Sequence, residues 1–345
     1  MTNVLVTGGA GFIGSNFVPY FLEVNPDVHL VNIDALTYAG DLNNLREVEN
    51  HDRYTFIKGD ICDRKLIEKI FEKYDIQGVM HFAAESHVDN SITNPDAFMQ
   101  TNILGTFNLI DVAKKYWMVS PGVYKEAYKN SRFHHVSTDE VYGTLGKEGL
   151  FIETTPYAPN SPYSASKASS DFIVRSYHHT YDMNVVTTNC SNNYGPKQHD
   201  EKLIPTIIGK ALAGEPIPIY GDGSNVRDWL YVLDHCKGIA LAYDKGVSGE
   251  TYNIGGRNER NNLYIAQTVC EILDQKHPRS EGSYKALITY VKDRAGHDFR
   301  YAIDASKIEN ELGWEADENF ESGIDKTIDW YLNKFIHNNK TKSLA

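Results

Sequence analysis

The sequence has little cysteine and no clustering of metal-binding side chains. Its 345 residues include only four cysteines, and none of them forms a C-x-x-C pair: Cys62, Cys190, Cys236 and Cys270. Disulfides are therefore not expected, and the spacing fits a reducing cytoplasm. The thirteen histidines are scattered without an H-E-x-x-H spacing. A metal site is not expected.

Long apolar runs and an excess of positive charge are also missing. No apolar stretch approaches the roughly 20 residues of a membrane span. A signal peptide of the usual form is not expected, because a strand begins by Asn3 and a glycine loop follows at Gly8. The formal net charge is −12, from 34 basic and 46 acidic residues. This balance argues against a general nucleic-acid binder, although backbone N–H groups could still bind a phosphate.

The composition is that of an ordinary globular protein, with 41% hydrophobic and 23% charged residues. A single hydrophobic core stops growing at about 250–300 residues, so we expect two closely joined lobes. The first half alternates apolar runs with helical patterns. Strands are predicted at 4–6, 29–33, 54–58, 78–82, 133–136 and 184–188, and helices at 12–24, 64–74, 97–115 and 162–181. This order predicts an α/β fold, a doubly wound parallel sheet with helices on both faces.

The regular alternation ends near residue 190, where stretches rich in glycine and proline begin. We predict a first domain over residues 1–190, to which later segments return. Residues 191–337 are expected to form mostly a smaller, mixed and irregular lobe, and residues 338–345 a polar tail. Trp229 and Tyr231 alternate in a short apolar run and are predicted to belong to a core rather than to a ligand site.

The first predicted strand leads into a glycine loop, Thr7-Gly8-Gly9-Ala10-Gly11-Phe12-Ile13-Gly14, that opens the first helix. Small residues let the backbone approach a pyrophosphate, which the helix N-terminus attracts. Asp34 ends the second strand, where its carboxylate can accept from a ribose 2′-hydroxyl and would repel a 2′-phosphate. No arginine follows at residues 35–37. The pattern predicts an NAD site, rather than an NADP site, on a Rossmann-type sheet. Asp60-Ile61 and residues 82–86 follow the next two strands, at the edge where ligands gather.

Tyr163 and Lys167 lie four residues apart, on one face of the predicted helix 162–181. An ammonium beside a phenol stabilises the phenolate and lowers a pKa that is ordinarily about 10. Tyr163 is then a usable base toward a hydroxyl near neutral pH. Alone, such a pair could be an ordinary surface pair. The glycine loop, and Thr138 after the fifth strand, favour a redox site.

The chain resembles the extended short-chain dehydrogenase/reductase family over nearly its whole length. The stretches that carry the resemblance are TGGAGFIGSNF at 7–17, HFAAESHVD at 81–89, STDEVYG at 137–143, PYSASKA at 162–168, NCSNNYGP at 189–196 and GDGSNVRDWLYV at 221–232. Within this family it is most similar to the 4,6-dehydratases of dTDP-glucose. Asp139 and Glu140 are the discriminating residues, because epimerases of the same scaffold usually have small or hydroxyl residues there.

The resemblance implies a dehydration in which NAD⁺ accepts a hydride from the sugar and the reduced cofactor later returns it. Tyr163 would deprotonate the hydroxyl on sugar carbon 4 while Thr138 holds that oxygen. Glu140 would remove the carbon 5 proton, and a protonated Asp139 would donate to the hydroxyl leaving carbon 6. Adjacent carboxyls can push their pKa values apart in this way. On a regular strand the two would face opposite sides, so an irregular turn is predicted after Thr138.

The resemblance also implies the residues of both binding sites. The NAD contacts would be Gly8, Gly11, Phe12, Ile13, Gly14, Asp34, Ala35, Leu36, Thr37, Asp60, Ile61, Phe82, Ala83, Ala84, Ser86, Thr101, Tyr163, Lys167 and Asn193. The nucleotide-sugar contacts would be Ser86, Thr138, Asn192, Lys202, Leu203, Pro218, Ile219, Tyr220, Arg227, Asn262, Asp293, Arg294 and His297. Most of the second set belongs to the 191–337 lobe, which would bind the nucleotide-sugar. The chain departs from the family at Ala295, usually Pro, and at Asn90, often Arg.

A cytoplasmic lyase of deoxysugar biosynthesis, such as the rhamnose pathway, is the role that the resemblance implies. A homodimer through the 97–115 and 162–181 helices is also implied, with no membrane or nucleic-acid partner. Two other functions stay open. One is a nucleotide-sugar 4-epimerase or decarboxylase on the same scaffold. The other is a non-catalytic NAD-sensing module, which predicts a damaged Tyr/Lys pair, whereas Tyr163 and Lys167 are both present.

Overall fold

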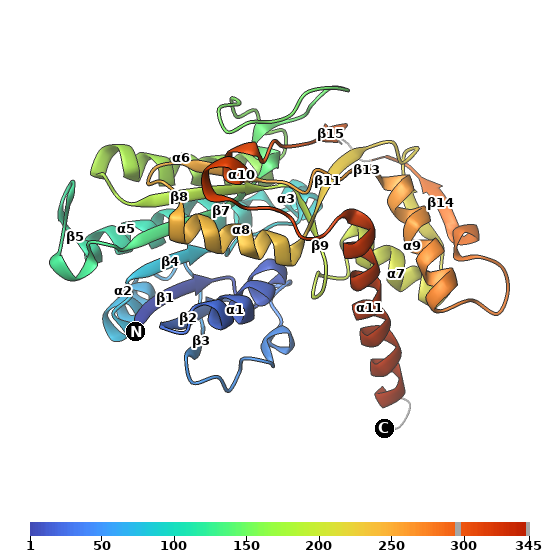
Figure 1. Cartoon of the computed structure of the whole chain (residues 1–345), viewed down its shortest axis with the longest axis horizontal. Helices are drawn as coiled ribbons and strands as arrows, with labels where there is room; N and C mark the ends of the chain where they lie inside the picture. Colours follow the sequence, from blue (N-terminus) through green and yellow to red (C-terminus); the bar gives the residue numbers. More distant parts are fainter. Residues whose placement is uncertain (294–297, 343–345) are drawn as a thin grey trace.

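The computed structural model describes the backbone of residues 1–293 and 298–342, and side chains as far as residue 336. Its centre is a seven-stranded sheet in the order β12-β8-β7-β4-β1-β2-β3 (Figure 1). Every neighbouring pair of these strands is parallel. The strands are β1 (Thr2–Thr7), β2 (Val28–Asp34), β3 (Tyr54–Lys58), β4 (Gly78–His81), β7 (Arg132–Thr138), β8 (Val185–Cys190) and β12 (Thr251–Ile254). The predicted doubly wound parallel sheet is confirmed.

Helices cover both faces of this sheet, as the alternation of side chains along β1 shows. Val4 and Val6 pack in one apolar cluster, and Leu5 packs in another. The first cluster includes side chains of α1 (Phe12–Val24), α8 (Val232–Lys245) and α10 (Ser306–Leu312). The second includes side chains of α2 (Arg64–Tyr74), α5 (Thr106–Trp117) and α6 (Pro162–Tyr181). Successive strand residues point to opposite faces, so both faces of the sheet are buried.

Helix α6 begins as predicted. The Ser161 hydroxyl accepts from the backbone N–H of Ser164, and the Ser164 hydroxyl in turn accepts from the N–H of Ser161. Pro162 occupies the first turn, where its missing N–H costs no hydrogen bond. This reciprocal cap fixes the point at which Tyr163 leaves the loop.

The predicted 97–115 helix is interrupted in the structure. It consists of α4 (Pro95–Phe98), a π-helical segment η2 (Met99–Gly105) and α5. A Cβ on Gly105 would lie 2.7 Å from Ile61 Cδ1, so the π turn brings backbone close to the end of β3. Apolar periodicity alone does not distinguish a π segment from an α-helix, which is why the sequence predicted one helix.

Short elements connect these parts. They are η1 (Leu42–Leu45), α3 (Val88–Thr93), β5 (Met118–Ser120), β6 (Val123–Tyr124), η3 (Glu126–Tyr128) and η4 (Asp139–Tyr142). Strands β5 and β6 form an antiparallel pair. No strand was predicted in this stretch.

The C-terminal part is more regular than the sequence suggested. Helices α7 (Leu203–Ala213), α9 (Asn262–Lys276) and α11 (Phe320–Lys342) share one apolar cluster, in which Trp229 and Tyr231 are also buried as predicted (Figure 1). The smaller elements are β9 (Asn192–Tyr194), β10 (Ile217–Tyr220), β11 (Val226–Tyr231), β13 (Glu259–Asn261), η5 (Tyr284–Leu287), β14 (Ile288–Val291) and β15 (Arg300–Tyr301). The expectation of an irregular lobe was wrong for its helices. A break in the β-α-β order was read as a loss of regular structure.

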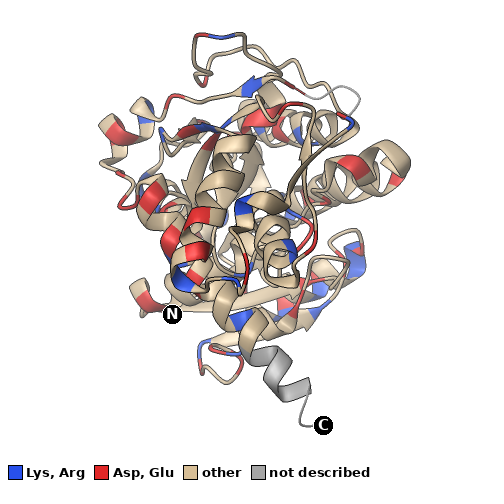
Figure 2. Cartoon of the chain, turned by 90° about the vertical axis from the view of Figure 1, so that its right-hand side faces the viewer, with Lys and Arg blue, Asp and Glu red and all other residues tan. Residues whose placement is uncertain are grey.

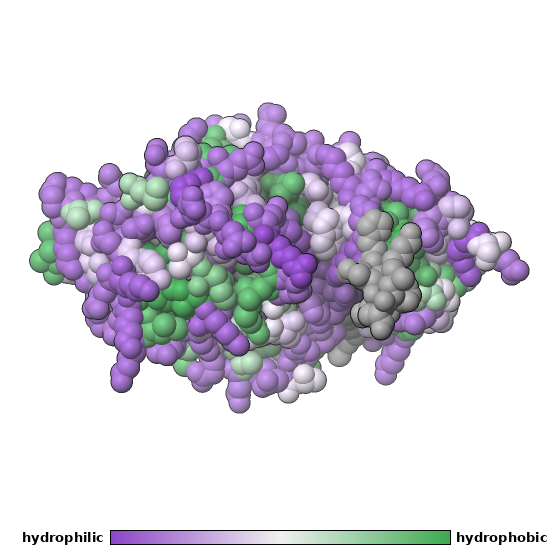
Figure 3. All heavy atoms as spheres, turned by 90° about the horizontal axis from the view of Figure 1, so that it is seen from below, coloured by the Kyte–Doolittle hydropathy of each residue, from purple (hydrophilic) through white to green (hydrophobic). Residues whose placement is uncertain are grey.

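The surface matches the acidic but mixed composition. Basic and acidic residues are interspersed along the ribbon in the view of Figure 2. On the face shown in Figure 3, apolar residues form separate patches among hydrophilic ones. Among the described helices, none combines the length and the apolar character that crossing a membrane requires.

Candidate active site

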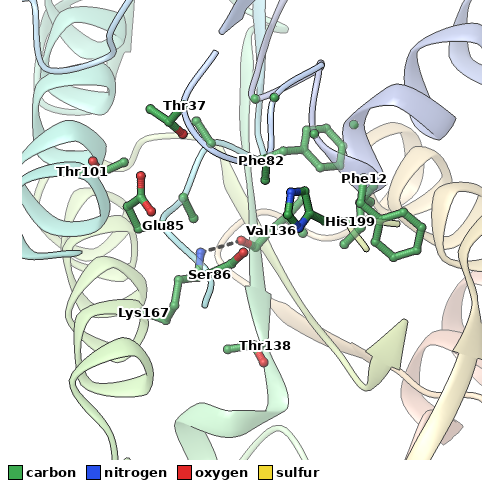
Figure 4. Close-up of a pocket in the computed structure, with 18 of the residues that line it drawn as sticks. Phe12, Thr37, Phe82, Glu85, Ser86, Thr101, Val136, Thr138, Lys167 and His199 are labelled. Atoms are coloured by element: carbon green, nitrogen blue, oxygen red, sulfur yellow. Dashed lines mark hydrogen bonds between the residues drawn. The ribbon is translucent and has the colours of Figure 1, made fainter. Parts of the chain in front are cut away.

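A cleft of about 330 Å³ opens at the carboxyl edge of the parallel strands (Figure 4). The glycine loop and the ends of β2, β3, β4 and β7 form one wall. The start of α6 and residues 190–202 form the other. The carboxyl edge is where an open parallel sheet binds its ligands. The cleft therefore lies where the strand order predicts a site.

The glycine loop is shaped for close backbone contact. Gly8 has a φ of 73°, and a Cβ there would lie 2.7 Å from backbone atoms of Ala83. A Cβ on Gly14 would lie 2.4 Å from the carbonyl oxygen of Gly8. Gly11 is the N-cap of α1 and offers no side chain to the first helical N–H groups. The loop thus presents a positive helix end to the cleft and fits the pyrophosphate of a dinucleotide.

Asp34 ties the end of β2 to this loop. Its Oδ2 accepts from the backbone N–H of Ala10 at 2.9 Å, and its Oδ1 accepts from the N–H of Leu36 at 2.8 Å. Leu36 itself has a φ of 54° and is not among the residues that line the cleft. The cleft contains every other residue predicted to contact NAD. The residues present therefore fit the cofactor that the sequence predicted.

The irregular turn predicted after Thr138 is present. Thr138 ends β7, and the 3₁₀ turn η4 follows at once. The Thr138 hydroxyl accepts from the backbone N–H of Glu140 at 3.3 Å and so caps the turn. As a result Asp139 and Glu140 both line the cleft, together with Thr138 and Tyr163.

The two adjacent carboxyls have different electrostatic surroundings. Burial raises the pKa of Asp139 well above its ordinary value, and the carboxylates of Glu140 and Asp228 raise it further. Burial also raises the pKa of Glu140, but Arg227 and Lys202 act in the opposite direction. Asp139 thus holds its proton more strongly than Glu140. This asymmetry suits a pair in which one member donates a proton and the other accepts one.

Tyr163 and Lys167 are both buried at the start of α6. Burial raises the pKa of Tyr163 well above its ordinary value, and Glu140 adds to this effect, while a hydrogen bond with Thr138 opposes it. Burial lowers the pKa of Lys167, whose ammonium donates to the carbonyl oxygen of Val136 at 2.8 Å (Figure 4). The net shift in the pKa of Tyr163 is therefore upward, opposite to the lowering predicted from Lys167. The ammonium is directed at the strand carbonyl, and desolvation of the phenol dominates.

A buried carboxylate lies one helical turn beyond Lys167. Asp171 accepts from the hydroxyls of Ser137 at 2.9 Å and Tyr157 at 3.0 Å, and His135 Nε2 lies 3.0 Å from its other oxygen. Burial raises the pKa of Asp171 to about 6, although Lys167 acts to lower it. This polar cluster supports the side of β7 that faces α6.

The residues predicted to bind the nucleotide-sugar divide into two groups. Ser86, Thr138, Asn192 and Lys202 line the cleft, and Lys202 Nζ donates to the Ser86 carbonyl at 3.3 Å. Outside the cleft are Leu203 at the start of α7, Pro218, Ile219 and Tyr220 on β10, Arg227 on β11, Asn262 at the start of α9, and Asp293. Asp293 lies beside the end of β10, since a Cβ on Gly221 would be 3.0 Å from its Oδ2. Arg294 and His297, like Ala295, lie outside the described residues.

Arg227 is committed to backbone carbonyls. Its guanidinium donates to the carbonyl oxygens of Val226 at 2.7 Å, Phe299 at 3.3 Å and Asp298 at 3.0 Å. Its centre also lies 4.3 Å from the ring centroid of Tyr301. The side chain is therefore held rigidly at the cleft side of β11, close enough to Glu140 to affect its pKa.

Several residues of the cleft were not predicted as site residues. Among them are Tyr38, Cys190, Ser191, Gln198, His199 and Glu201. The rings of Tyr38 and His199 lie 5.6 Å apart, and the Tyr38 hydroxyl lies 3.3 Å from the Ser86 hydroxyl. Glu85 also lines the cleft and belongs to the stretch 82–86, which the rule for strand ends placed at this edge. Tyr38 and His199 come from loops without a motif, and only the fold brings them together.

Within residues 1–293 and 298–336, whose side chains are described, there is no group of three or more His, Cys, Asp or Glu side chains that could hold a metal ion. The cleft offers hydroxyl, carboxyl and ammonium groups around a backbone cradle. Such a set is suited to proton transfer beside an organic cofactor.

The chain is similar to known proteins over nearly its full length. The family model described as GDP-mannose 4,6 dehydratase matches residues 5–327. A dTDP-glucose 4,6-dehydratase of Xanthomonas campestris pv. campestris (strain B100) is 57% identical over 334 residues, 96% of this chain and 93% of the relative.

Two solved structures share the fold. The dTDP-glucose 4,6-dehydratase of Bacillus anthracis in complex with NAD has a TM-score of 0.84 and 46% identity, covering 96% of both chains. The dTDP-glucose 4,6-dehydratase of Streptomyces venezuelae with NAD and TYD bound has a TM-score of 0.86 and 44% identity, covering 96% of this chain and 97% of that one.

Proposed function

The chain belongs to the GDP-mannose 4,6 dehydratase family, among the extended short-chain dehydrogenase/reductases, and on this premise we propose that it dehydrates dTDP-glucose to dTDP-4-keto-6-deoxyglucose. It is an enzyme whose cofactor is NAD. One observation carries the proposal. The turn η4 brings two adjacent carboxyls into the cleft that contains the glycine loop and Tyr163, and the pKa of Asp139 is raised more strongly than that of Glu140.

The proposed roles begin at the oxygen on sugar carbon 4. Tyr163 accepts the proton of that hydroxyl, and the Thr138 hydroxyl, which hydrogen-bonds with the phenol, holds the same oxygen. Lys167 keeps a cation one helical turn from Tyr163. NAD⁺, when bound, would supply the acceptor for the carbon 4 hydride and the hydride that returns to carbon 6.

Elimination of water is the step that needs two carboxyl groups. A ketone at carbon 4 makes the carbon 5 proton acidic, and Glu140 removes it. The carbon 6 hydroxyl leaves as water once Asp139 has donated a proton to its oxygen. Glu140 then returns its proton to carbon 5. The pKa of Asp139, which is raised more strongly than that of Glu140, matches this division of roles.

For nucleotide-sugar binding, we assign Ser86, Asn192 and Lys202 in the cleft, with Arg227, Asn262 and Asp293 beyond it. Residues 1–190, together with β12 and α8, form the cofactor-binding domain in this proposal. Residues 191–337 form most of the substrate lobe. The proposal makes the enzyme a lyase, and its 4-keto-6-deoxy product an intermediate for deoxysugar biosynthesis such as the rhamnose pathway.

We further propose a homodimer formed by α5 and α6. These helices contact each other on one side of the sheet. They carry exposed apolar side chains, Phe107 on α5 and Phe172 on α6, and Leu104 precedes α5 in η2. Exposed apolar residues that cluster on neighbouring helices favour an interface. Light scattering of the wild type and a Phe107→Asp/Phe172→Asp variant should show a dimer that the variant loses.

We also place the protein in the cytoplasm. All four cysteines are free, as expected in a reducing compartment. Fractionation of cells that express the chain should recover it with cytoplasmic markers.

The function is tested by giving the purified chain dTDP-, UDP- and GDP-glucose without added NAD⁺. We expect dTDP-glucose to lose one water by mass spectrometry and to gain the alkaline absorbance of a 4-keto sugar. A product of unchanged mass with inverted carbon 4 would identify a 4-epimerase instead. UDP-glucuronic acid is given in a parallel assay, in which loss of carbon dioxide would identify a decarboxylase. Bound NAD without turnover of any nucleotide-sugar would favour a sensing module.

A further inference from the structure

Next to the two carboxyls of η4 lies a buried carboxylate that the cycle above does not use. Asp228 follows Arg227 on β11 and is only 1% exposed. Removing a charge from water is costly unless other groups compensate for the loss. Its surroundings therefore need an explanation.

The strand registers bring Asp228 beside Asp139. Thr138 on β7 pairs with Cys190 on β8, and Asp139 follows in η4, directly after this last pair. Asn192 on β9 pairs with Trp229 on β11, and Asp228 directly precedes Trp229. The two aspartates therefore lie on either side of the short segment 190–192, and Asp228 is close enough to Asp139 to raise its pKa.

The two carboxyl groups are hydrogen-bonded differently. Asp228 accepts two backbone N–H bonds, from Gly256 at 2.9 Å and from Asn258 at 2.7 Å. Two such donors favour an ionised carboxylate. Asp139 Oδ1 has the Thr138 hydroxyl at 3.5 Å, and its Oδ2 is buried without a hydrogen-bond partner in the described part of the chain. The charge is therefore better stabilised on Asp228, and the proton on Asp139.

The turn that supplies these donors is built for close approach. A Cβ on Gly255 would lie 2.8 Å from Asp228 Oδ2, and a Cβ on Gly256 would lie 2.1 Å from the carbonyl oxygen of Trp229. Only glycine leaves room for the backbone to reach the carboxylate at both positions. The ionised form of Asp228 is thus supported by main-chain atoms that a side-chain rotation cannot remove.

Other groups around the two aspartates also shift their pKa values. Besides Asp228, Glu140 raises the pKa of Asp139, and Arg227 and the Thr138 hydroxyl lower it. Tyr163 on α6 and Cys190 on β8 also face Asp139. Around Asp228, burial and Glu259 raise the pKa, and the two backbone donors and the Ser191 hydroxyl lower it. Burial raises the pKa of both carboxyls, but the two backbone N–H donors oppose this rise at Asp228 and so favour its anion.

We propose that Asp228 is a positioning residue for the acid of the reaction, whose buried carboxylate keeps the neighbouring Asp139 carboxyl protonated. Asp139 is then ready to donate to the oxygen that leaves carbon 6. The carbon 5–hydrogen and carbon 6–oxygen bonds break, Glu140 takes the carbon 5 proton, and water departs with the proton of Asp139. Two carboxylates then face each other, which favours return of a proton to Asp139 from water. This inference rests on the proposed function.

The test is the Asp228→Asn variant, assayed for dehydration of dTDP-glucose across pH. Turnover that needs protonated Asp139 falls as pH rises through the pKa of that carboxyl. Without the anion at position 228 this pKa drops, so the alkaline loss of kcat should begin about one pH unit lower. An unshifted alkaline limb would overturn the proposal.

A second readout separates proton donation from general damage. In dTDP-6-deoxy-6-fluoroglucose the leaving group is fluoride, which departs as an anion and needs the acid far less. Asp228→Asn should be at least about ten-fold slower than wild type with dTDP-glucose at alkaline pH, and close to wild type with the fluoro substrate. An equal defect on both substrates would show a structural role only, and would overturn the assignment.

Asp234→Asn is the matched control. Asp234 is also 1% exposed and accepts a backbone N–H, from Glu318 at 2.9 Å, but it lies on α8 and does not line the cleft. Its pH profile should match wild type, and an equal shift would contradict the proposal.

Should the Asp228→Asn variant fail to fold, Asp228→Ser keeps an acceptor without charge and is assayed in the same way. Failure of the wild type to dehydrate dTDP-glucose would reject the proposed function, whereas an active wild type with an unshifted variant would reject this inference alone.

Discussion

The ammonium of Lys167 donates a hydrogen bond of 2.8 Å to the carbonyl oxygen of Val136, two residues before the end of β7. Spacing on a helix shows that Lys167 and Tyr163 share a face, but not which atom the ammonium contacts. The contact joins α6 to the strand that carries Thr138. This hydrogen bond fixes the position of the ammonium. The phenol of Tyr163 is buried, and burial raises its pKa.

Removal of the Tyr163 hydroxyl should stop the reaction at its first step. We expect Tyr163→Phe to lower kcat by about 10²–10⁴-fold, as for loss of an acid–base group, because no other side chain has been assigned to the carbon 4 proton. Retained NAD, measured after denaturation, should match wild type. Tyr177→Phe is the control, because Tyr177 lies on the same helix as Tyr163 but does not line the cleft. Its hydroxyl donates to Asp111 of α5 at 3.2 Å. A control that loses as much activity would refute the assignment.

Glu140→Gln should separate oxidation from elimination. Without the carboxylate, the carbon 5 proton stays in place while carbon 4 can still be oxidised. We expect turnover to fall by at least about 10²-fold and absorbance of the reduced cofactor to build up after substrate is added. Exchange of the carbon 5 hydrogen with deuterated water should fall in parallel. Normal turnover would exclude Glu140 as the base, and the exposed Glu148→Gln should change nothing.

Two alanine substitutions in the glycine loop should have different effects. A Cβ at Gly14 would lie 2.4 Å from the Gly8 carbonyl oxygen, whereas a Cβ at Gly11 would be 3.4 Å from the same atom. Gly14→Ala should cost about 1–3 kcal/mol of stability, as overpacking does, and lower the melting temperature of the cofactor-free chain. Gly11→Ala should leave that temperature nearly unchanged and weaken NAD binding, because the residue lines the cleft. Calorimetry of binding and unfolding would check both outcomes, and equal melting losses would contradict the clash.

Asp171 should make the stability depend on pH in a defined direction. Burial raises its pKa in the folded chain from 3.8 to about 6. A raised pKa means that the group contributes stability below its unfolded value, and that this contribution is lost as pH rises through the folded value. Relative to Asp171→Asn, the wild type should lose about 3 kcal/mol of unfolding free energy across this interval. Urea unfolding of both proteins at several pH values would measure the difference, and a constant difference would disprove it. The exposed Asp52→Asn is the control.

The sequence predicted the sheet and its helices well where a single periodicity decides the structure. Helices α1, α2 and α6 and strand β3 have the predicted bounds, because each combines a clear apolar pattern with a cap or a glycine. The π turn of η2 was not predicted, since it depends on how Gly105 packs against Ile61. The C-terminal helices were missed because a rule based on β-α-β alternation does not apply to them.

The cofactor side of the candidate site could be predicted because it follows strand ends in chain order. The substrate side could not be placed in the same way. Arg227 was predicted as a nucleotide-sugar contact, but the position of its guanidinium depends on the carbonyls of Asp298 and Phe299, which are far away in sequence. The proximity of Asp228 to Asp139 likewise depends on the registers of two strand pairs, β7 with β8 and β9 with β11. Contacts between segments that are distant in the chain produce no local sequence pattern from which they could be predicted.

The position of β12 affects how the chain is made. This strand comes from residues 251–254 but completes the parallel sheet beside β8. During synthesis, every residue of β8 through Cys190 emerges well before its last neighbour exists. For that interval β8 is an unpaired sheet edge that could pair with another nascent chain. Slow translation between residues 190 and 254 would lengthen the exposure, so expression yield should respond to codon choice in that interval more than in the first strands.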